Sequence, residues 1–192
     1  GYTSHAIGMD ATNPKFCEVQ VHITTQSANI AQGVNKDGLD QGAGDQGMMF
    51  GYACEETEAY EGLKGRYFPL AAALSQRLSR RLTAVREQGI LPWARPDGKS
   101  QVTVQYDDEG EIEKVHTVVI AIQHDEELKN QFGGSEAEEL AYVEQQVREH
   151  VVEHSIPSEL LAEGYKLVVN GTGRFADPGG PYADAGLTLS LI

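Results

Sequence analysis

Apolar residues recur at helical spacing in the stretch that follows Tyr67. The positions that share one face of the predicted helix are Leu70, Leu74, Leu78, Leu82 and Val85. The arginines of this stretch lie largely off that face, which is typical of a solvated helix surface. Pro69 suits the first helical turn and Gly89 suits the C-terminal cap. The pattern therefore predicts an amphipathic helix between these two residues.

A second helix is predicted after Ser135-Glu136-Ala137-Glu138, which has the spacing of a capping box. Its apolar stripe consists of Leu140, Val143, Val147 and Val151. The helix ends in His150-Val151-Val152-Glu153-His154, the H-x-x-E-H spacing of one class of zinc peptidase. A zinc site also needs a third ligand and a buried pocket, and no third ligand stands out. We therefore favour an exposed helix end over a zinc site.

Strands are predicted where apolar and polar residues alternate or where apolar residues form a continuous run. They cover Phe16 to Thr25, Gln101 to Tyr106, Glu111 to Gln123 and Tyr165 to Asn170. Asp107-Asp108-Glu109-Gly110 joins the second and third of these as a hairpin. His124 ends the third strand, and a lone histidine there is more often a structural hydrogen-bond partner than a ligand. The expected fold class is α+β, with antiparallel or mixed sheets and helices on one face.

Two short stretches resemble nucleotide-binding motifs. Gly42, Gly44 and Gly47 satisfy G-x-G-x-x-G, but the polar residues from Ile30 to Gln41 contain no strand that could enter a dinucleotide-binding turn or a kinase glycine loop. Gly98-Lys99-Ser100 resembles the end of a P-loop, but Trp93 stands where the first glycine is required.

The polar stretch from Gln26 to Gln41 is predicted to be a long loop, either a functional lid or a disordered connector.

Composition and charge narrow the possible functions. A formal charge of −14 disfavours nucleic-acid binding, which relies on clustered Lys and Arg. No run approaches the ~18 apolar residues of a membrane span, so no membrane association is expected. Cys17 and Cys54 form no C-x-x-C pair, which argues against a disulfide framework and favours a reduced, cytoplasmic location.

Two places combine the side chains that a nucleotide needs. Asp97 and Lys99 are two residues apart and would point the same way in an extended strand, which offers an acceptor and a phosphate-seeking ammonium. In the glycine-rich stretch from Gly171 to Thr188, Arg174 offers a bidentate anion clamp and Phe175 a stacking face. The alternative for this second stretch is an ordinary glycine-rich surface loop.

Five segments, in order, resemble S-adenosylmethionine synthetases (methionine adenosyltransferases). They are Gln26-Ser27 through Gly33-Val34, Gly42 to Ala53, Leu91 to Thr103, Thr172 to Phe175, and Gly179 to Thr188. The strings Gly-Ala-Gly-Asp-Gln-Gly and Arg-Pro-Asp-Gly-Lys-Ser-Gln-Val are highly specific, and the similarity covers nearly the whole chain. The family joins ATP to L-methionine and releases pyrophosphate and phosphate, with Mg²⁺ and K⁺ assisting. Its subunits have three similar α+β domains, and its active sites lie between paired subunits.

The resemblance implies a role for each matching residue. Asp97 would contact the nucleoside, Lys99 the polyphosphate, and Arg174 with Phe175 the adenosine. Asp184 would lie beside both methionine and ATP, Gln26 would line the methionine pocket, and Asp45 would belong to the site as well. The implied catalytic set is Lys99, Asp184 and Asp45, and no metal ligand is assigned. The expected partners are ATP, L-methionine, and a second copy in a homodimer or dimer of dimers.

The resemblance also implies a division of the chain. Residues 1–25 would be a strand-containing piece of a neighbouring domain, 26–41 a mobile lid loop, and 42–54 the glycine-rich motif with a short helix. Residues 55–177 would form one complete domain, and 178–192 would begin a further domain segment.

The sequence departs from the family pattern at positions that matter for phosphate binding. The family's His-Pro-Asp-Lys segment is absent, and Leu189-Ser190-Leu191 stands where the family continues Gly-Arg-Lys. The chain thus matches the middle of a full-length enzyme, and we expect it to be weakly active or inactive alone. The alternative is a non-catalytic regulatory or binding module that pairs with a full-length synthetase subunit.

Overall fold

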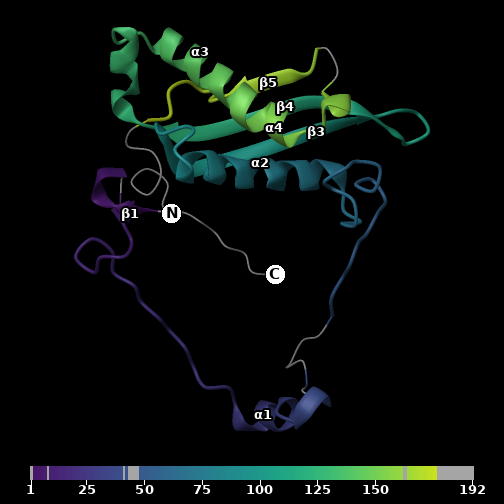
Figure 1. Ribbon diagram of the computed structural model, residues 1–192. Helices are drawn as coiled ribbons and strands as arrows, with labels where there is room; N and C mark the ends of the chain where they lie inside the picture. Colours follow the sequence, from purple (N-terminus) through teal and green to yellow (C-terminus); the bar gives the residue numbers. More distant parts are fainter. Residues whose placement is uncertain (1, 8, 41, 43–47, 162–163, 177–192) are drawn as a thin grey trace.

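The computed structural model describes residues 2–7, 9–40, 42, 48–161 and 164–176. It contains a packed α+β body and a long extended segment that precedes it (Figure 1). The α-helices are α1 (Ala28–Val34), α2 (Leu70–Glu87), α3 (Glu136–Val147) and α4 (Glu153–Ser155). The strands are β1 (Thr3–Ser4), β2 (Met9–Asp10), β3 (Ala94–Tyr106), β4 (Ile112–His124) and β5 (Lys166–Val169). Short 3₁₀ turns occupy His5–Ile7, Gly38–Asp40, Glu126–Phe132 and Ser158–Leu160, and a π-helical turn occupies Arg148–Val152.

The main sheet has the order β3-β4-β5 and is mixed. β3 and β4 pair antiparallel across the predicted hairpin, where the Asp107 carboxylate accepts hydrogen bonds from the backbone N–H groups of Glu109 and Glu111. β5 pairs with β4 in parallel, which requires the crossover through α3. The predicted fold class and the last three predicted strands are confirmed, and β3 begins seven residues earlier than expected, at Ala94 rather than Gln101.

One face of the sheet packs against the helices. Val102, Val118, Ile120 and Ile122 alternate along β3 and β4 and are buried with the apolar stripe of α2 and with Val143 and Val147 of α3. Both predicted helices are confirmed. α2 presents the expected leucines to the core, and Ser135 caps α3 by accepting a hydrogen bond from the N–H of Glu138 at 3.4 Å. The helices therefore cover one face of the sheet, as the pattern indicated.

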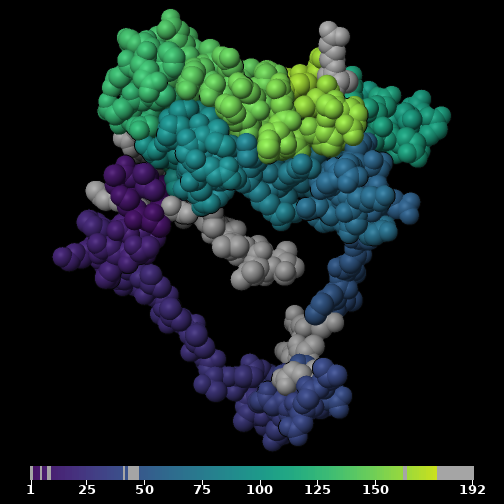
Figure 2. Space-filling model, in the orientation of Figure 1, coloured from purple at the N-terminus to yellow at the C-terminus, as the bar shows by residue number. Residues whose placement is uncertain are grey.

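The predicted strand over Phe16 to Thr25 is wrong. The structure has no strand there, and Val19, Val21 and Ile23 are 74%, 72% and 88% exposed. Alternation stabilises a strand only when a neighbouring strand satisfies its backbone groups and covers one face. No described strand lies beside this segment, so its apolar side chains remain in solvent. In Figure 2 the segment is thin and extended, outside the packed body.

The two stretches around the glycine-rich motif also differ from expectation. Between Gln26 and Gln41 the sequence suggested a loop without structure, but α1 forms there, and the N–H of Ala31 donates to the carbonyl of Ser27. The stretch 42–54 was expected to hold the glycine-rich motif and a short helix; its described residues 42 and 48–54 form no helix, and Met48, Met49 and Phe50 are exposed. Whether the stretch over 26–41 moves as a lid stays a prediction, and Gly44, Asp45 and Gly47 lie outside the described residues.

No described helix is long and apolar enough to cross a membrane. Cys17 and Cys54 are both free thiols. Among the described residues, no three His, Cys, Asp or Glu side chains are grouped closely enough to hold a metal ion, and this includes the H-x-x-E-H stretch. His150 lies in the π-helical turn and accepts a hydrogen bond at its backbone carbonyl from Arg81, so the turn is tied to α2.

Candidate functional site

Asp97 and Lys99 lie at the beginning of β3, beside a β-bulge. The register shifts between Ala94, which is opposite His124, and Gly98, which is opposite Ile122. Pro96 lies inside this bulge, where its missing N–H costs no ladder hydrogen bond. Lys99 is back in the regular ladder, is exposed, and lies on the sheet face that the helices do not cover. Since Asp97 lies within the bulge, regular strand alternation does not apply to it, and the shared orientation of its side chain with Lys99 stays a prediction.

Gly98 separates these two candidates, and its lack of a side chain has a packing reason. A Cβ at this position would come within 3.2 Å of the carbonyl oxygen of Ala121 and 3.3 Å of the Ile122 side chain. A larger residue would therefore require the backbone of β4 at Ala121 and the Ile122 side chain to shift by a few tenths of an ångström. Glycine at this position lets β3 approach β4 closely.

A tyrosine from the start of the chain reaches the same end of the sheet. The Tyr2 hydroxyl donates to Oε1 of Gln123 at 2.6 Å, and Nε2 of Gln123 donates to the carbonyl of Ala176 at 3.2 Å. Burial raises the pKa of the Tyr2 phenol, and the negative charge of Asp97 raises it further. Tyr2 is thus close to Asp97, and Gln123 connects this corner to the segment that carries Arg174 and Phe175.

The segment after β5 turns back along the end of β4 through Asn170. Asn170 has φ of +47°, a left-handed conformation that asparagine tolerates better than most residues. Its side-chain amide bonds to both backbone groups of Ile122, at 2.9 Å to the N–H and 3.1 Å to the carbonyl. The N–H of His124 then donates to the carbonyl of Phe175 at 3.0 Å. The backbone of Phe175 is therefore fixed beside the C-terminal end of β4.

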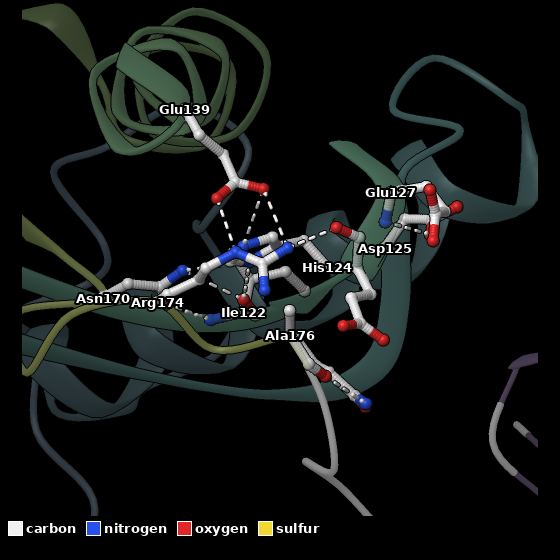
Figure 3. Close-up of polar contacts among 10 residues, drawn as sticks. Ile122, His124, Asp125, Glu127, Glu139, Asn170, Arg174 and Ala176 are labelled. Carbon is white, nitrogen blue, oxygen red and sulfur yellow. Dashed lines mark hydrogen bonds and ion pairs between the residues drawn. The ribbon is translucent and has the colours of Figure 1, made fainter. Parts of the chain in front are cut away.

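Arg174 is held by a buried carboxylate. Glu139 of α3 is fully buried and accepts a hydrogen bond from Nε of Arg174 at 2.7 Å and a longer one from Nη2 at 3.4 Å (Figure 3). Nη2 also donates to the backbone carbonyl of Glu126. The hydrogen bonds to Glu139 raise the pKa of Arg174. Much of the donor set that could clamp an anionic ligand is thus engaged within the protein.

His124 completes this buried cluster. Its Nε2 is 3.6 Å from Oε1 of Glu139, slightly beyond hydrogen-bonding distance, and its ring lies edge-on to Trp93. Nδ1 is 3.4 Å from the side-chain nitrogen of Asn170 and 3.4 Å from the carbonyl of Ile122. A proton on Nε2 leaves Nδ1 to accept from Asn170 and directs the N–H toward the carboxylate, so the surroundings favour this tautomer. Among the described residues these contacts are all with protein groups, which fits the structural role expected for a histidine at a strand end.

The buried position of His124 predicts a pH-dependent stability. Burial lowers the pKa of its imidazole below the ordinary 6.5, with Arg174 acting in the same direction and with Ile122, Glu139 and Asp125 opposing it. As the pH falls below about 6.5, the unfolded chain binds a proton that the folded chain does not, so folding stability falls with decreasing pH. We expect a slope of up to about 1.4 kcal/mol per pH unit from this group.

Urea unfolding between pH 7.5 and 5 would measure this slope. His124→Gln should flatten the pH dependence, whereas His116→Gln, which changes an exposed histidine of the same strand, should leave it as it is. Equal slopes in wild type and His124→Gln would contradict a buried neutral His124.

Neither of the two main hollows of the described residues suits ATP. One, of about 130 Å³, lies between α2 and the bulge and is smaller than the ~300 Å³ at which ligand pockets begin. The other, of about 500 Å³, is lined by Glu55, Glu56, Glu58 and Glu111, which would repel a polyphosphate. The candidate site is therefore the surface at the end of the sheet, where the bulge of β3 lies near the segment after β5.

The structure brings together only part of the predicted site. Asp97, Arg174 and Phe175 lie at one end of the sheet through the links described above, and Lys99 follows Asp97 along β3. Gln26 lies two residues before α1, which is well apart from the sheet in Figure 1, so the structure does not bring it to the others. Asp45 and Asp184 lie outside the described residues.

Sequence reasoning missed the residues that hold this corner in place, chiefly Glu139, Asn170 and Gln123. Glu139 carried a usable signal, because it lies one helical turn before Val143 on the stripe that faces the core. A carboxylate on an apolar stripe needs a buried partner. Asn170 and Gln123 had no comparable signal, because a single amide at a strand end is common.

Comparison with known proteins agrees with the motifs. A family profile described as "S-adenosylmethionine synthetase, central domain" matches residues 40–175. An S-adenosylmethionine synthase of Nocardioides sp. (strain ATCC BAA-499 / JS614) is 44% identical over 199 aligned positions, covering 98% of this chain and 45% of the relative. The chain thus spans just under half the length of this relative. On this evidence the chain belongs to the S-adenosylmethionine synthetase family and contains the region that matches its central domain.

Proposed function

We propose that this chain contributes the nucleoside-binding part of a methionine adenosyltransferase. In this reaction the thioether sulfur of L-methionine forms a bond to C5′ of ATP, and the bond from C5′ to the triphosphate oxygen breaks. The sulfur uses a lone pair and loses no proton, so no general base is required. The electron pair of the broken bond leaves with the triphosphate, which water then cleaves to pyrophosphate and phosphate.

The chain's own residues would serve binding and orientation. Lys99 would place an ammonium beside the triphosphate, whose negative charge increases as the C–O bond breaks. Asp97 and the Arg174–Phe175 segment would hold the adenosine so that C5′ faces the sulfur. Gln26 would contact methionine, and Asp184 and Asp45 would complete the site.

Metal ions and subunit pairing enter this proposal through the family alone. Mg²⁺ and K⁺ would neutralise the polyphosphate, but no group of three potential ligands occurs among the described residues, so we assign no step to a metal. A homodimer or dimer of dimers, or pairing with a full-length subunit, would supply the remaining residues of the site. A cytoplasmic location fits these substrates.

The observation that supports the proposal most directly is the arrangement at the end of the main sheet. Asp97 lies in the bulge near Tyr2, Tyr2 bonds to Gln123, and Gln123 bonds to Ala176, directly after Phe175. Asp97 and Phe175 are about 80 positions apart in the sequence and both belong to the family motifs, so this series of contacts between their segments supports the proposal.

Isothermal titration of the 192-residue chain with a non-hydrolysable ATP analogue, with and without methionine, tests the proposal. Wild type should bind the analogue, and Lys99→Met should weaken binding by about 10- to 150-fold, because a charge-assisted contact to phosphate is worth about 1.5–3 kcal/mol. Lys166→Met is the matched control: Lys166 is exposed on the same sheet face, on β5. No binding by wild type would favour the non-catalytic module, and equal affinities of wild type and Lys99→Met would exclude the role of Lys99.

A further inference from the structure

We propose that Glu139 is a positioning residue for the nucleoside site, acting through Arg174 on the backbone and ring of Phe175. This inference rests on the proposed function, since it concerns the same site. Glu139 itself lies inside the protein on α3 and would touch no substrate.

The contacts of Arg174 give the first step of the argument. Nε and Nη2 both point to the Glu139 carboxylate, and Nη2 also reaches the Glu126 carbonyl. These bonds fix the plane of the guanidinium between α3 and the 3₁₀ turn at Glu126–Phe132. A side chain held on two sides can turn little toward a ligand, so its main effect is on its own backbone.

Phe175 is the residue whose backbone is constrained by the fixed Arg174 side chain. Phe175 follows Arg174 directly, and its carbonyl accepts from the N–H of His124. Two fixed points therefore flank the peptide between residues 174 and 175: the ion pair on one side and the β4 hydrogen bond on the other. Fixing this peptide limits the directions in which the Phe175 ring can point, as a stacking surface for a base requires.

The burial of Glu139 gives an independent step. A fully buried carboxylate carries a large desolvation cost that a leucine at the same place on α3 would avoid. Its charge gives Arg174 a two-point contact with a defined direction, which an apolar residue would not give. Glu144 and Arg148 make an ordinary ion pair on the same helix, four residues apart and both substantially exposed. Glu139 differs by reaching the segment after β5.

The test combines ligand affinity with backbone protection. Glu139→Gln keeps the size of the side chain and removes its charge, and Glu144→Gln is the matched control. All variants are titrated with the non-hydrolysable ATP analogue at a temperature where circular dichroism shows them almost fully folded, so a change in affinity does not reflect unfolding. Hydrogen exchange followed by NMR reports separately on the His124 amide, which is bonded to Phe175.

If Glu139 positions Phe175, Glu139→Gln weakens analogue binding by about tenfold and speeds exchange of the His124 amide, while Glu144→Gln changes neither. Arg174→Met should weaken binding at least as much as Glu139→Gln does. The double variant Glu139→Gln/Arg174→Met should bind no more weakly than Arg174→Met, because both changes break the same contact. Additive losses, or unchanged affinity and exchange in Glu139→Gln, would overturn the proposal. If Glu139→Gln does not fold, Arg174→Lys replaces it in the test, because lysine keeps the positive charge but loses the two-point contact. Weaker analogue binding and faster exchange of the His124 amide would then support the proposal, and no change in either would overturn it.

The two readouts separate this inference from the proposed function. Absence of analogue binding in wild type would refute the proposed function but not the role of Glu139 in fixing Phe175. Rapid exchange of the His124 amide in Glu139→Gln would then still support Glu139 as the residue that fixes Phe175, and unchanged exchange would refute both.

Discussion

Replacing Arg174 by methionine is expected to lower the free energy of unfolding by about 3–5 kcal/mol. The change leaves the Glu139 carboxylate without its cationic partner although the side chain is fully buried. His124 is a weak substitute for this cation, because burial lowers its pKa, although the change also removes the further lowering by Arg174. Urea unfolding of wild type and variant at pH 7.5 measures the loss.

Two further variants show whether the unpaired charge is the cause. Glu144→Gln removes the ion pair with Arg148, in which both side chains are about 40% exposed, and should cost less than about 1 kcal/mol. Adding Glu139→Gln to Arg174→Met removes the stranded charge and should recover part of the lost stability. A double variant that is less stable than Arg174→Met alone would mean that Glu139 is stabilised by groups other than Arg174.

Truncating Ile120 to alanine is expected to destabilise the fold by about 2–5 kcal/mol. Ile120 is fully buried on the central strand β4, where its side chain faces the helices. Its removal opens a cavity that the sheet cannot close, because β3 and β5 fix β4 on both sides. Thermal and urea unfolding both report the loss, and Ile120→Val should cost only about 0.5–1.5 kcal/mol.

Ile23 offers the matched control for this truncation. It is 88% exposed in the extended segment, so Ile23→Ala should change the stability by no more than about 0.5 kcal/mol. A large loss at Ile23 would show that the segment over Phe16 to Thr25 is packed in solution, as the alternation of its sequence first suggested.

The elements that the sequence predicted well are those whose stability comes from nearby residues. The helical spacing of the α2 leucines, the Ser135 cap of α3 and the hairpin at Asp107 are each recognisable within a few helical turns or across one tight loop. The sequence did not predict which distant strands pair. The alternation at Val19 to Ile23 gave no information on whether a neighbouring strand exists, and the parallel pairing of β5 depends on a crossover through α3.

The residues of the candidate site likewise fall into those that the sequence could identify and those that depend on the tertiary structure. Motif strings singled out Asp97, Lys99, Arg174 and Phe175, because a family's ligand contacts cluster in short segments. The bulge around Asp97 requires β3 to pair with β4, and the contact of Arg174 with Glu139 requires the segment after β5 to pack against α3. The sequence could indicate that Glu139 needs a partner, but the identity of that partner depends on the tertiary structure.

The parallel addition of β5 also bears on the order of folding. The hairpin of β3 and β4 closes a short loop, and α2 precedes it directly, so these three elements can associate at low entropic cost. β5 must wait until the chain has crossed over through α3, and such non-local pairing is slow. We therefore expect the corner that holds Arg174 and Phe175 to be among the last parts to assemble and among the first to open.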